Sequence, residues 1–246
     1  AHDKRFKLVR QQDLADRLKQ HLAMGWSPEQ FAGLLTLEGA SMTISPESIY
    51  RFIAHRVAQK DYSWHTLLPR RKFYRGRRPK KGGAPSKTFQ HYVSIEQRGA
   101  DVQSRQTPGH WEVDLMAFRN NSSFLLIAHE RMSRKTLAVI QPDKTAKAAR
   151  NSLCKLLGRL PKAMRKSITY DNGTEFAQHH IVNQKLKTQS FFCHTHSPWE
   201  KGGVENAIGR LRRHLPRKTD ISAISQHHIN AIIAKHNNIP RKCLGF

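Results

Sequence analysis

The chain has 246 residues, enough for one large domain or two smaller ones, and its net charge of +25 favours a polyanionic partner, above all nucleic acid. A ribosome-like or membrane-surface basic protein is the alternative. The chain's three cysteines form no CxxC pair, so we expect neither a disulfide framework nor a zinc finger. The longest purely apolar run of the chain is Phe124–Ala128, which is too short to cross a membrane.

Three helices are predicted near the N-terminus. The first covers about 12–24, where leucines recur on one face. The second opens on the sequence SPEQ at Ser27, which combines an N-cap serine, a proline at the first helical position and a capping-box glutamine. The third repeats this start at Ser45 and continues as a basic helix. This order is typical of a helix-turn-helix module whose third helix presents Ser48 and Arg51 to the major groove, and an ordinary three-helix bundle is the alternative.

A strongly basic segment follows these helices. Residues 69–87 hold nine Lys and Arg among Gly, Pro and two aromatic side chains. This composition cannot bury a core, so we expect an extended segment, either a solvated spacer or an arm that tracks the DNA backbone. Its candidate DNA contacts are Arg70, Arg71, Lys72, Arg75, Arg77, Arg78, Lys80 and Lys81.

An α/β pattern begins near position 107. Strands are predicted at 111–118, 123–130, 135–141, 167–170 and 190–194, and helices at 145–157, 174–188, 203–215 and 222–238. Three strands followed by alternating helices and strands match the RNase H-like fold. The expected class is therefore α/β, an RNase H-like mixed five-stranded sheet with flanking helices, preceded by a small all-α helix-turn-helix domain. The predicted domains are 1–65 (helical), 66–106 (basic linker) and 107–246 (core).

Three carboxylates stand out against the basic background: Asp114, Asp171 and Glu205. The first lies in a predicted strand, the second directly follows another, and the third lies at the edge of the buried stripe of a helix. Taken singly, Asp114 could be a strand-edge acid, Asp171 could be part of an Asp-Asn-Gly turn, and Glu205 could be the ion-pair partner of an arginine on its helix. Phosphoryl transfer on DNA uses two metal ions, and Mg²⁺ prefers hard oxygen ligands. Together, the three carboxylates therefore predict a metal-dependent active site.

Several neighbouring residues are candidates for accessory roles. Glu112 shares a strand face with the first aspartate and is an outer-shell ligand, a base or a structural acid. Asn172 would position the loop or a phosphate, and Glu175 is a helix first-turn acid or a catalytic accessory. We expect Trp199 to support the entry to the last core helix rather than to stack on a base. Further candidate DNA contacts are Lys201, Arg210, Arg212 and Arg213.

A resemblance to a known family covers nearly the whole chain. It rests on the strings PGHWEVDLM, PDKTA, TYDNGTEFA, SPWEKGGVENAIGRLRRHLPRKTDIS and NIPRKCLGF, and on WSPEQFAGLL and ISPESIYRFI in the helical module. The chain resembles DDE-type insertion-sequence transposases of the IS-thirty group, which have a retroviral-integrase-like core. Glu205 follows Asp171 by 34 positions, the spacing of that group. The resemblance implies that Asp114, Asp171 and Glu205 are the catalytic triad and hold two Mg²⁺ (or Mn²⁺) ions. His129 and Val113 depart from the group's usual residues without removing a ligand.

The resemblance also implies a function. The protein would be a bacterial, cytoplasmic and nucleoid-associated transposase that binds the terminal inverted repeats of its element, cuts a strand at each end and joins the freed ends to target DNA. A homodimer or higher oligomer is implied by the synaptic pairing of two ends. The chain lacks an initiator Met and the group has a longer N-terminal region, so we expect a fragment. The alternatives are a catalytically idle, domesticated repressor and a plain RNase H-like nuclease.

Overall fold

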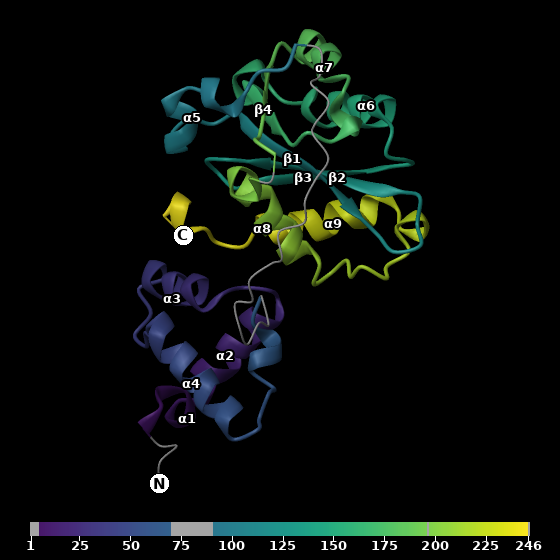
Figure 1. The fold of residues 1–246 in the computed structure, drawn as a ribbon. Helices are drawn as coiled ribbons and strands as arrows, with labels where there is room; N and C mark the ends of the chain where they lie inside the picture. Colours follow the sequence, from purple (N-terminus) through teal and green to yellow (C-terminus); the bar gives the residue numbers. More distant parts are fainter. Residues whose placement is uncertain (1–4, 70–90, 196, 246) are drawn as a thin grey trace. The chain divides into compact units, whose positions relative to one another are not determined.

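The computed structural model describes residues 5–69, 91–195 and 197–245 (Figure 1). These form two compact units, one from the described part of Ala1–Arg78 with Ile239–Phe246, the other from the described part of Pro79–Asn238. The eight predicted DNA contacts from Arg70 to Lys81 lie outside the described residues. Within the described ranges, no helix has the length and apolar character needed to cross a membrane.

The first unit is helical. It contains α1 (Lys7–Arg10), α2 (Gln12–Ala23), α3 (Pro28–Leu37), α4 (Pro46–Ala58) and the short 3₁₀ helix η2 (His65–Leu67). The capping box predicted for the second helix is present, because the backbone N–H of Gln30 donates to the Ser27 hydroxyl at 3.3 Å and the Ser27 N–H donates to the Gln30 side chain at 2.9 Å. The three predicted helices are confirmed.

The spacing of these helices bears on the helix-turn-helix prediction. Residues 38–45 separate α3 from α4, whereas a helix-turn-helix motif has a turn of about 3–4 residues. The tighter turn joins α2 to α3 and passes through Gly25, whose φ of 93° requires glycine. Assignment of α4 as the DNA-reading helix stays a prediction.

The second unit is built on a mixed sheet of five strands, as predicted. The strands are β1 (His110–Ala117), β2 (Phe124–Glu130), β3 (Thr136–Gln141), β4 (Ser167–Tyr170) and β5 (Gln189–Phe192), in the spatial order β3-β2-β1-β4-β5. The first three form an antiparallel meander, while β4 runs parallel to β1 and β5 runs parallel to β4. This is the RNase H-like topology that the element order indicated.

Helices cover both faces of the sheet (Figure 1). On one face, α6 (Ala146–Leu157) and α7 (His179–Leu186) pack in a core that includes Val113, Leu126 and Leu153. On the other, α8 (Gly202–Leu211) and α9 (Gln226–Asn237) pack in a core that includes Met116, Ile127 and Val204. Because successive side chains of a strand alternate between faces, Glu112 and Asp114 share the face that α8 covers.

Two sequence expectations differ from the structure. The helix predicted at 174–188 is divided into the 3₁₀ turn η5 (Thr174–Phe176) and α7. Residues 91–106, expected to belong to the linker, contain η3 (Ile95–Gln97) and α5 (Ala100–Ser104) and bury Ile95 and Val102. The backbone N–H of Phe192 on β5 also donates to the Val93 carbonyl at 2.9 Å, so this segment packs with the sheet.

Candidate active site

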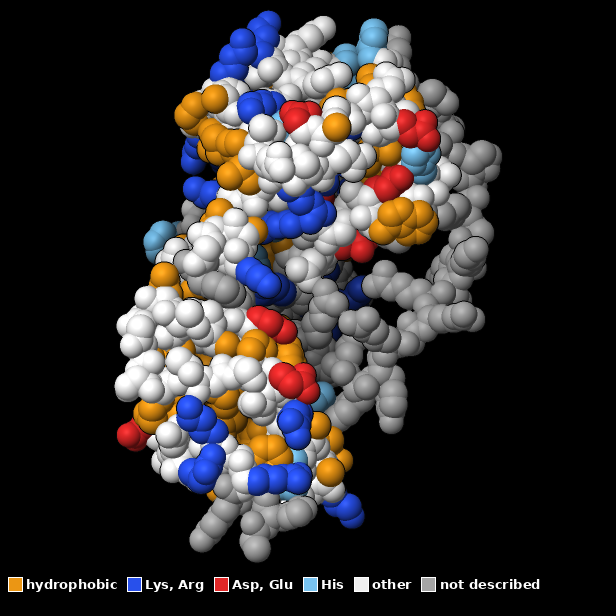
Figure 2. Space-filling view, turned by 90° about the vertical axis from the view of Figure 1, so that its left-hand side faces the viewer, with side chains coloured by type: hydrophobic (Ala, Val, Ile, Leu, Met, Phe, Trp, Pro, Cys, Tyr) orange, Lys and Arg blue, Asp and Glu red, His pale blue; other side chains and the backbone are white. Residues whose placement is uncertain are grey.

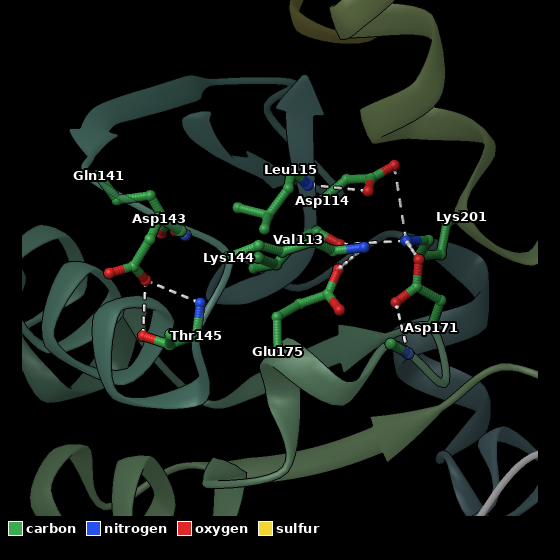
Figure 3. A network of polar contacts seen from close by, with 11 residues as sticks. Val113, Asp114, Leu115, Gln141, Asp143, Lys144, Thr145, Asp171, Glu175 and Lys201 are labelled. Atoms are coloured by element: carbon green, nitrogen blue, oxygen red, sulfur yellow. Dashed lines mark hydrogen bonds and ion pairs between the residues drawn. The ribbon is translucent and has the colours of Figure 1, made fainter. Parts of the chain in front are cut away.

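Asp114 and Asp171 lie side by side around one buried cation. Asp114 is on β1, and Asp171 directly follows β4, the parallel neighbour of β1. Lys201, the last residue of η6 (Pro198–Lys201), places its Nζ 2.8 Å from Asp171 Oδ2 and 3.6 Å from Asp114 Oδ2 (Figure 3). The same ammonium donates to the carbonyl of Val113 at 3.3 Å. The structure therefore joins two of the three predicted carboxylates through a lysine.

Each aspartate has one oxygen held by backbone and the other turned to Lys201. The N–H of Leu115 donates to Asp114 Oδ1 at 2.8 Å, and the N–H of Gly173 donates to Asp171 Oδ1 at 3.1 Å. These bonds orient both side chains without using the Oδ2 atoms. The two Oδ2 atoms are thus presented to a common cation.

The electrostatics of this trio follow from its partial burial. The Lys201 side chain is 5% exposed, against 26% for Asp114 and 43% for Asp171. Burial raises the pKa of the Asp114 carboxyl; Lys201 opposes this rise and Asp171 adds to it. Burial also lowers the pKa of Lys201, but Asp114 and Asp171 outweigh that effect, and the net shift is upward. The ammonium is therefore a charged partner of both carboxylates.

Glu112 is a buried, ion-paired acid, and these surroundings favour the structural role among the three predicted for it. Its side chain is fully buried and forms an ion pair with the guanidinium of Arg131. Its Oε2 accepts a hydrogen bond from the N–H of Val204, in the first turn of α8, at 2.9 Å. A Cβ on Gly203 would lie 2.6 Å from the same oxygen, so only glycine fits there. Glu112 thus anchors α8 to β1.

Glu205 lies one residue beyond this anchor and is exposed. The helix that carries it buries Val204, Ala207 and Leu211, and this fixes the position of its backbone on the sheet. Within the described residues, no three Asp, Glu, His or Cys side chains are close enough to hold one metal ion. The structure therefore does not bring Glu205 into the Asp114–Asp171 pair.

The aspartate pair suits a hard divalent cation. Mg²⁺ is usually held by one or two carboxylates together with water and substrate phosphates. The Oδ2 atoms of Asp114 and Asp171 both face the position of the Lys201 ammonium. A positive charge is therefore favoured at that position. These two residues fit one such ion.

The loop after β4 is held by two predicted accessory residues. Asn172 Nδ2 donates to the carbonyl of Cys193 at 2.9 Å, so this side chain positions the loop. Glu175 is buried in η5, and its Oε1 lies 3.4 Å from Nζ of Lys144 (Figure 3). Its Oε2 makes no hydrogen bond in the described part of the chain. The pairing of Glu175 with Lys144 was not predictable from sequence, because the two residues lie far apart in the chain.

The segment before α8 differs from the prediction in two residues. Trp199 is 73% exposed, so it does not support the entry to the helix. Lys201, predicted as a DNA contact, is buried against the aspartates instead, because η6 turns its side chain into the site. His194 holds this segment through Nδ1, 2.7 Å from Glu200 Oε1, and Nε2, 3.2 Å from Glu96 Oε1.

The remaining predicted DNA contacts, in α8 and just after it, are three arginines that differ in their contacts. Arg212 donates to the carbonyl of Ala117 at 2.6 Å and lies over the ring of Phe118, which gives it a structural role at the end of β1. Arg210 and Arg213 are half-buried. Figure 2 shows Lys and Arg side chains over the surface that it presents, as the net charge of +25 suggests.

The helical unit contains a basic cleft of about 360 Å³ next to α1 and α4. Ser48 and Arg51, the two residues predicted to read DNA, both line it. Its other charged lining residues are Arg5, Lys7 and Arg10, and no acidic side chain is among the described lining residues. Four cationic side chains around one opening suit a phosphate group.

No family model matches the chain. Over 93% of its length the chain is 33% identical to the transposase for insertion sequence element IS1086 of Cupriavidus metallidurans, of which it spans 68%. Over 92% it is 32% identical to transposase InsI for element IS30A of Escherichia coli, of which it spans 61%. Over 94% it is 32% identical to the transposase for element IS4351 of Bacteroides fragilis, of which it spans 69%.

Among solved structures, the chain is similar to a chain of the simian T-cell lymphotropic virus intasome in complex with PP2A regulatory subunit B56 gamma. The TM-score is 0.47 at 19% identity, and the match covers 62% of this chain and 55% of that chain.

Proposed function

The chain belongs to the IS30 family of insertion-sequence transposases, and from this premise we propose that it binds the terminal inverted repeats of its element and catalyses Mg²⁺-dependent strand cleavage and strand transfer into target DNA. The observation that carries this proposal is a pair of carboxylates turned toward one cation: Asp114 on β1 and Asp171 directly after β4, the parallel neighbour of β1. A repressor without catalysis has no use for such a pair.

The roles of the chain's own residues follow from their contacts. Asp114 and Asp171 would hold the divalent ion through their Oδ2 atoms, and the N–H groups of Leu115 and Gly173 orient the two carboxylates by holding the Oδ1 atoms. When bound, two such ions activate the attacking oxygen and stabilise the leaving oxygen in phosphoryl transfer. Glu205 is the proposed third carboxylate, and it would complete the site for the second ion.

Binding of DNA is proposed to involve both units. The basic cleft beside α4 would take a phosphate of the terminal repeat, with Ser48 and Arg51 at the groove. The basic segment at 69–87 would track the backbone, and Arg210 and Arg213 would contact DNA near the active site. Two copies of the chain would hold the two ends of the element in a synaptic complex.

Analysis of the reaction products tests this proposal against its alternatives. The chain is incubated with Mg²⁺, DNA that carries the ends of its own element, and a target plasmid. We expect cut ends and joined products in which element ends are linked to the plasmid. Cutting without joining would instead identify a nuclease, and binding without cutting would identify a repressor.

A further inference from the structure

Lys201 occupies the position that the proposed metal ion needs. Resting on the proposed function, we propose that Lys201 is an internal counter-ion that competes with the divalent cation for Asp114 and Asp171, so that the metal binds only as the ammonium withdraws. Lys201 is thereby a positioning residue, and its withdrawal turns its charge toward the phosphate of the substrate.

Lys201 and a divalent cation would compete because both would use the same two aspartate oxygens. Nζ of Lys201 contacts Asp114 Oδ2 and Asp171 Oδ2, the two oxygens that backbone N–H groups leave available. A Mg²⁺ ion would bind the same oxygens at about 2.0–2.1 Å. An ammonium 2.8 Å from one of them already occupies that space. The two cations therefore exclude one another.

Lys201 is held in the site by the two carboxylates, and it can leave when another cation replaces its charge. Its side chain is buried, and its withdrawal alone would leave two neighbouring carboxylates without a counter-charge. A divalent cation supplies that charge and makes the exchange possible. Among the described residues, the ammonium also donates to the neutral carbonyl of Val113, and the lysine side chain is a flexible four-carbon stem.

The place of Lys201 in the chain suggests where its charge goes. Lys201 is the N-cap residue of α8, and Glu205 lies in the first turn of the same helix. An ammonium that withdraws from the aspartates would stay at the start of α8, at the edge of the site. The ligand that suits a lysine there is a phosphate oxygen of nucleic acid.

Metal affinity tests the competition directly. Binding of Mn²⁺ to the full chain is measured by electron paramagnetic resonance for the wild type and for Lys201→Met, which removes the charge at similar volume. We expect Lys201→Met to bind Mn²⁺ at least about tenfold more tightly. Lys201→Arg keeps the charge and should show no such gain. As a matched control, Lys144→Met removes a nearby lysine that contacts Glu175 and should change the affinity by at most about threefold.

Lysine labelling in the wild-type chain tests withdrawal without any substitution at this position. An amine-reactive reagent followed by mass spectrometry should modify Lys201 slowly in chelator and faster in Mn²⁺, while Asp171→Asn should show no Mn²⁺ effect. If the wild type binds no Mn²⁺ through Asp171, the proposed function fails. If it binds Mn²⁺ but Lys201 stays protected, or if folded Lys201→Met gains no affinity, the competition alone is wrong and the lysine is a permanent structural partner.

Discussion

Glu112 Oε2 accepts a hydrogen bond of 2.9 Å from the backbone N–H of Val204, and this bond joins the strand that carries Asp114 to the helix that carries Glu205. The contact lies two residues from the first carboxylate and one from the second. Arg131, the residue after the end of β2, balances the buried charge of Glu112. The alignment of strand and helix thus depends on an ion pair that the solvent does not reach.

Loss of one partner of this ion pair should strongly destabilise the fold. Glu112→Gln leaves the Arg131 guanidinium buried without its counter-charge, and we expect it to lower the free energy of unfolding by about 3–5 kcal/mol in urea denaturation. The control is Glu38→Gln, which breaks the exposed pair with Arg17 and should cost at most about 1 kcal/mol. Equal effects of the two substitutions would show that Glu112 does not anchor α8.

Two adjacent glycines offer a matched test of how tightly α8 packs on β1. A Cβ at Gly203 would lie 2.6 Å from Glu112 Oε2 and 2.9 Å from His129 Cδ2, whereas a Cβ at Gly202 has nothing within 4 Å. Gly203→Ala should therefore lower stability by about 1–3 kcal/mol, while Gly202→Ala should be neutral or stabilise by up to about 1 kcal/mol. Thermal unfolding of both variants checks this. A stable Gly203→Ala protein would mean that the helix can shift away from the strand.

The His194 contacts predict a pH dependence of the segment before α8. The hydrogen bond and charge of Glu200, with a further contribution from Glu96, raise the pKa of His194. A raised pKa in the folded state means that the stabilisation is complete below the ordinary histidine pKa and is lost as the pH rises through the raised value. In an NMR titration, Glu200→Gln should lower the pKa of His194. An unchanged pKa in this variant would contradict the assigned contact.

Arg51 should contribute a phosphate contact through the cleft beside α4. Replacement of Arg51 by Gln should weaken binding to duplex DNA and reduce the slope of log affinity against log salt concentration by about 1. Lys155→Gln removes an exposed charge from α6 in the other unit and should leave the slope unchanged. If both variants keep the wild-type slope, the cleft is not a DNA contact.

Much of the fold was predictable because local signals agree with it. Serine caps mark the starts of α3, α4 and α9, and apolar spacing marks the strands. Packing of residues 91–106 was missed because isolated apolar residues such as Ile95 and Val102 form no periodic pattern. The break before α7 was missed for the opposite reason, since its sequence continues to favour a helix across the 3₁₀ turn.

The site was predictable only in part. Asp114 and Asp171 were found because acids are scarce in a basic chain, and strand order then places them side by side. The partner of Glu112 was not predictable, since Arg131 meets it only through the fold of the sheet. Burial of Lys201 was missed because a lysine in a basic segment is ordinarily on the surface, and its direction depends on the turn at η6.

The most direct test of the proposed active site is Mg²⁺-dependent nicking at the ends of the element by carboxylate variants. Asp171→Asn and Glu205→Gln should bind the DNA as the wild type does and produce no detectable nicks. Asp13→Asn, an exposed acid of α2, should nick normally. Wild-type nicking by Asp171→Asn and Glu205→Gln would contradict the assignment of these carboxylates to catalysis.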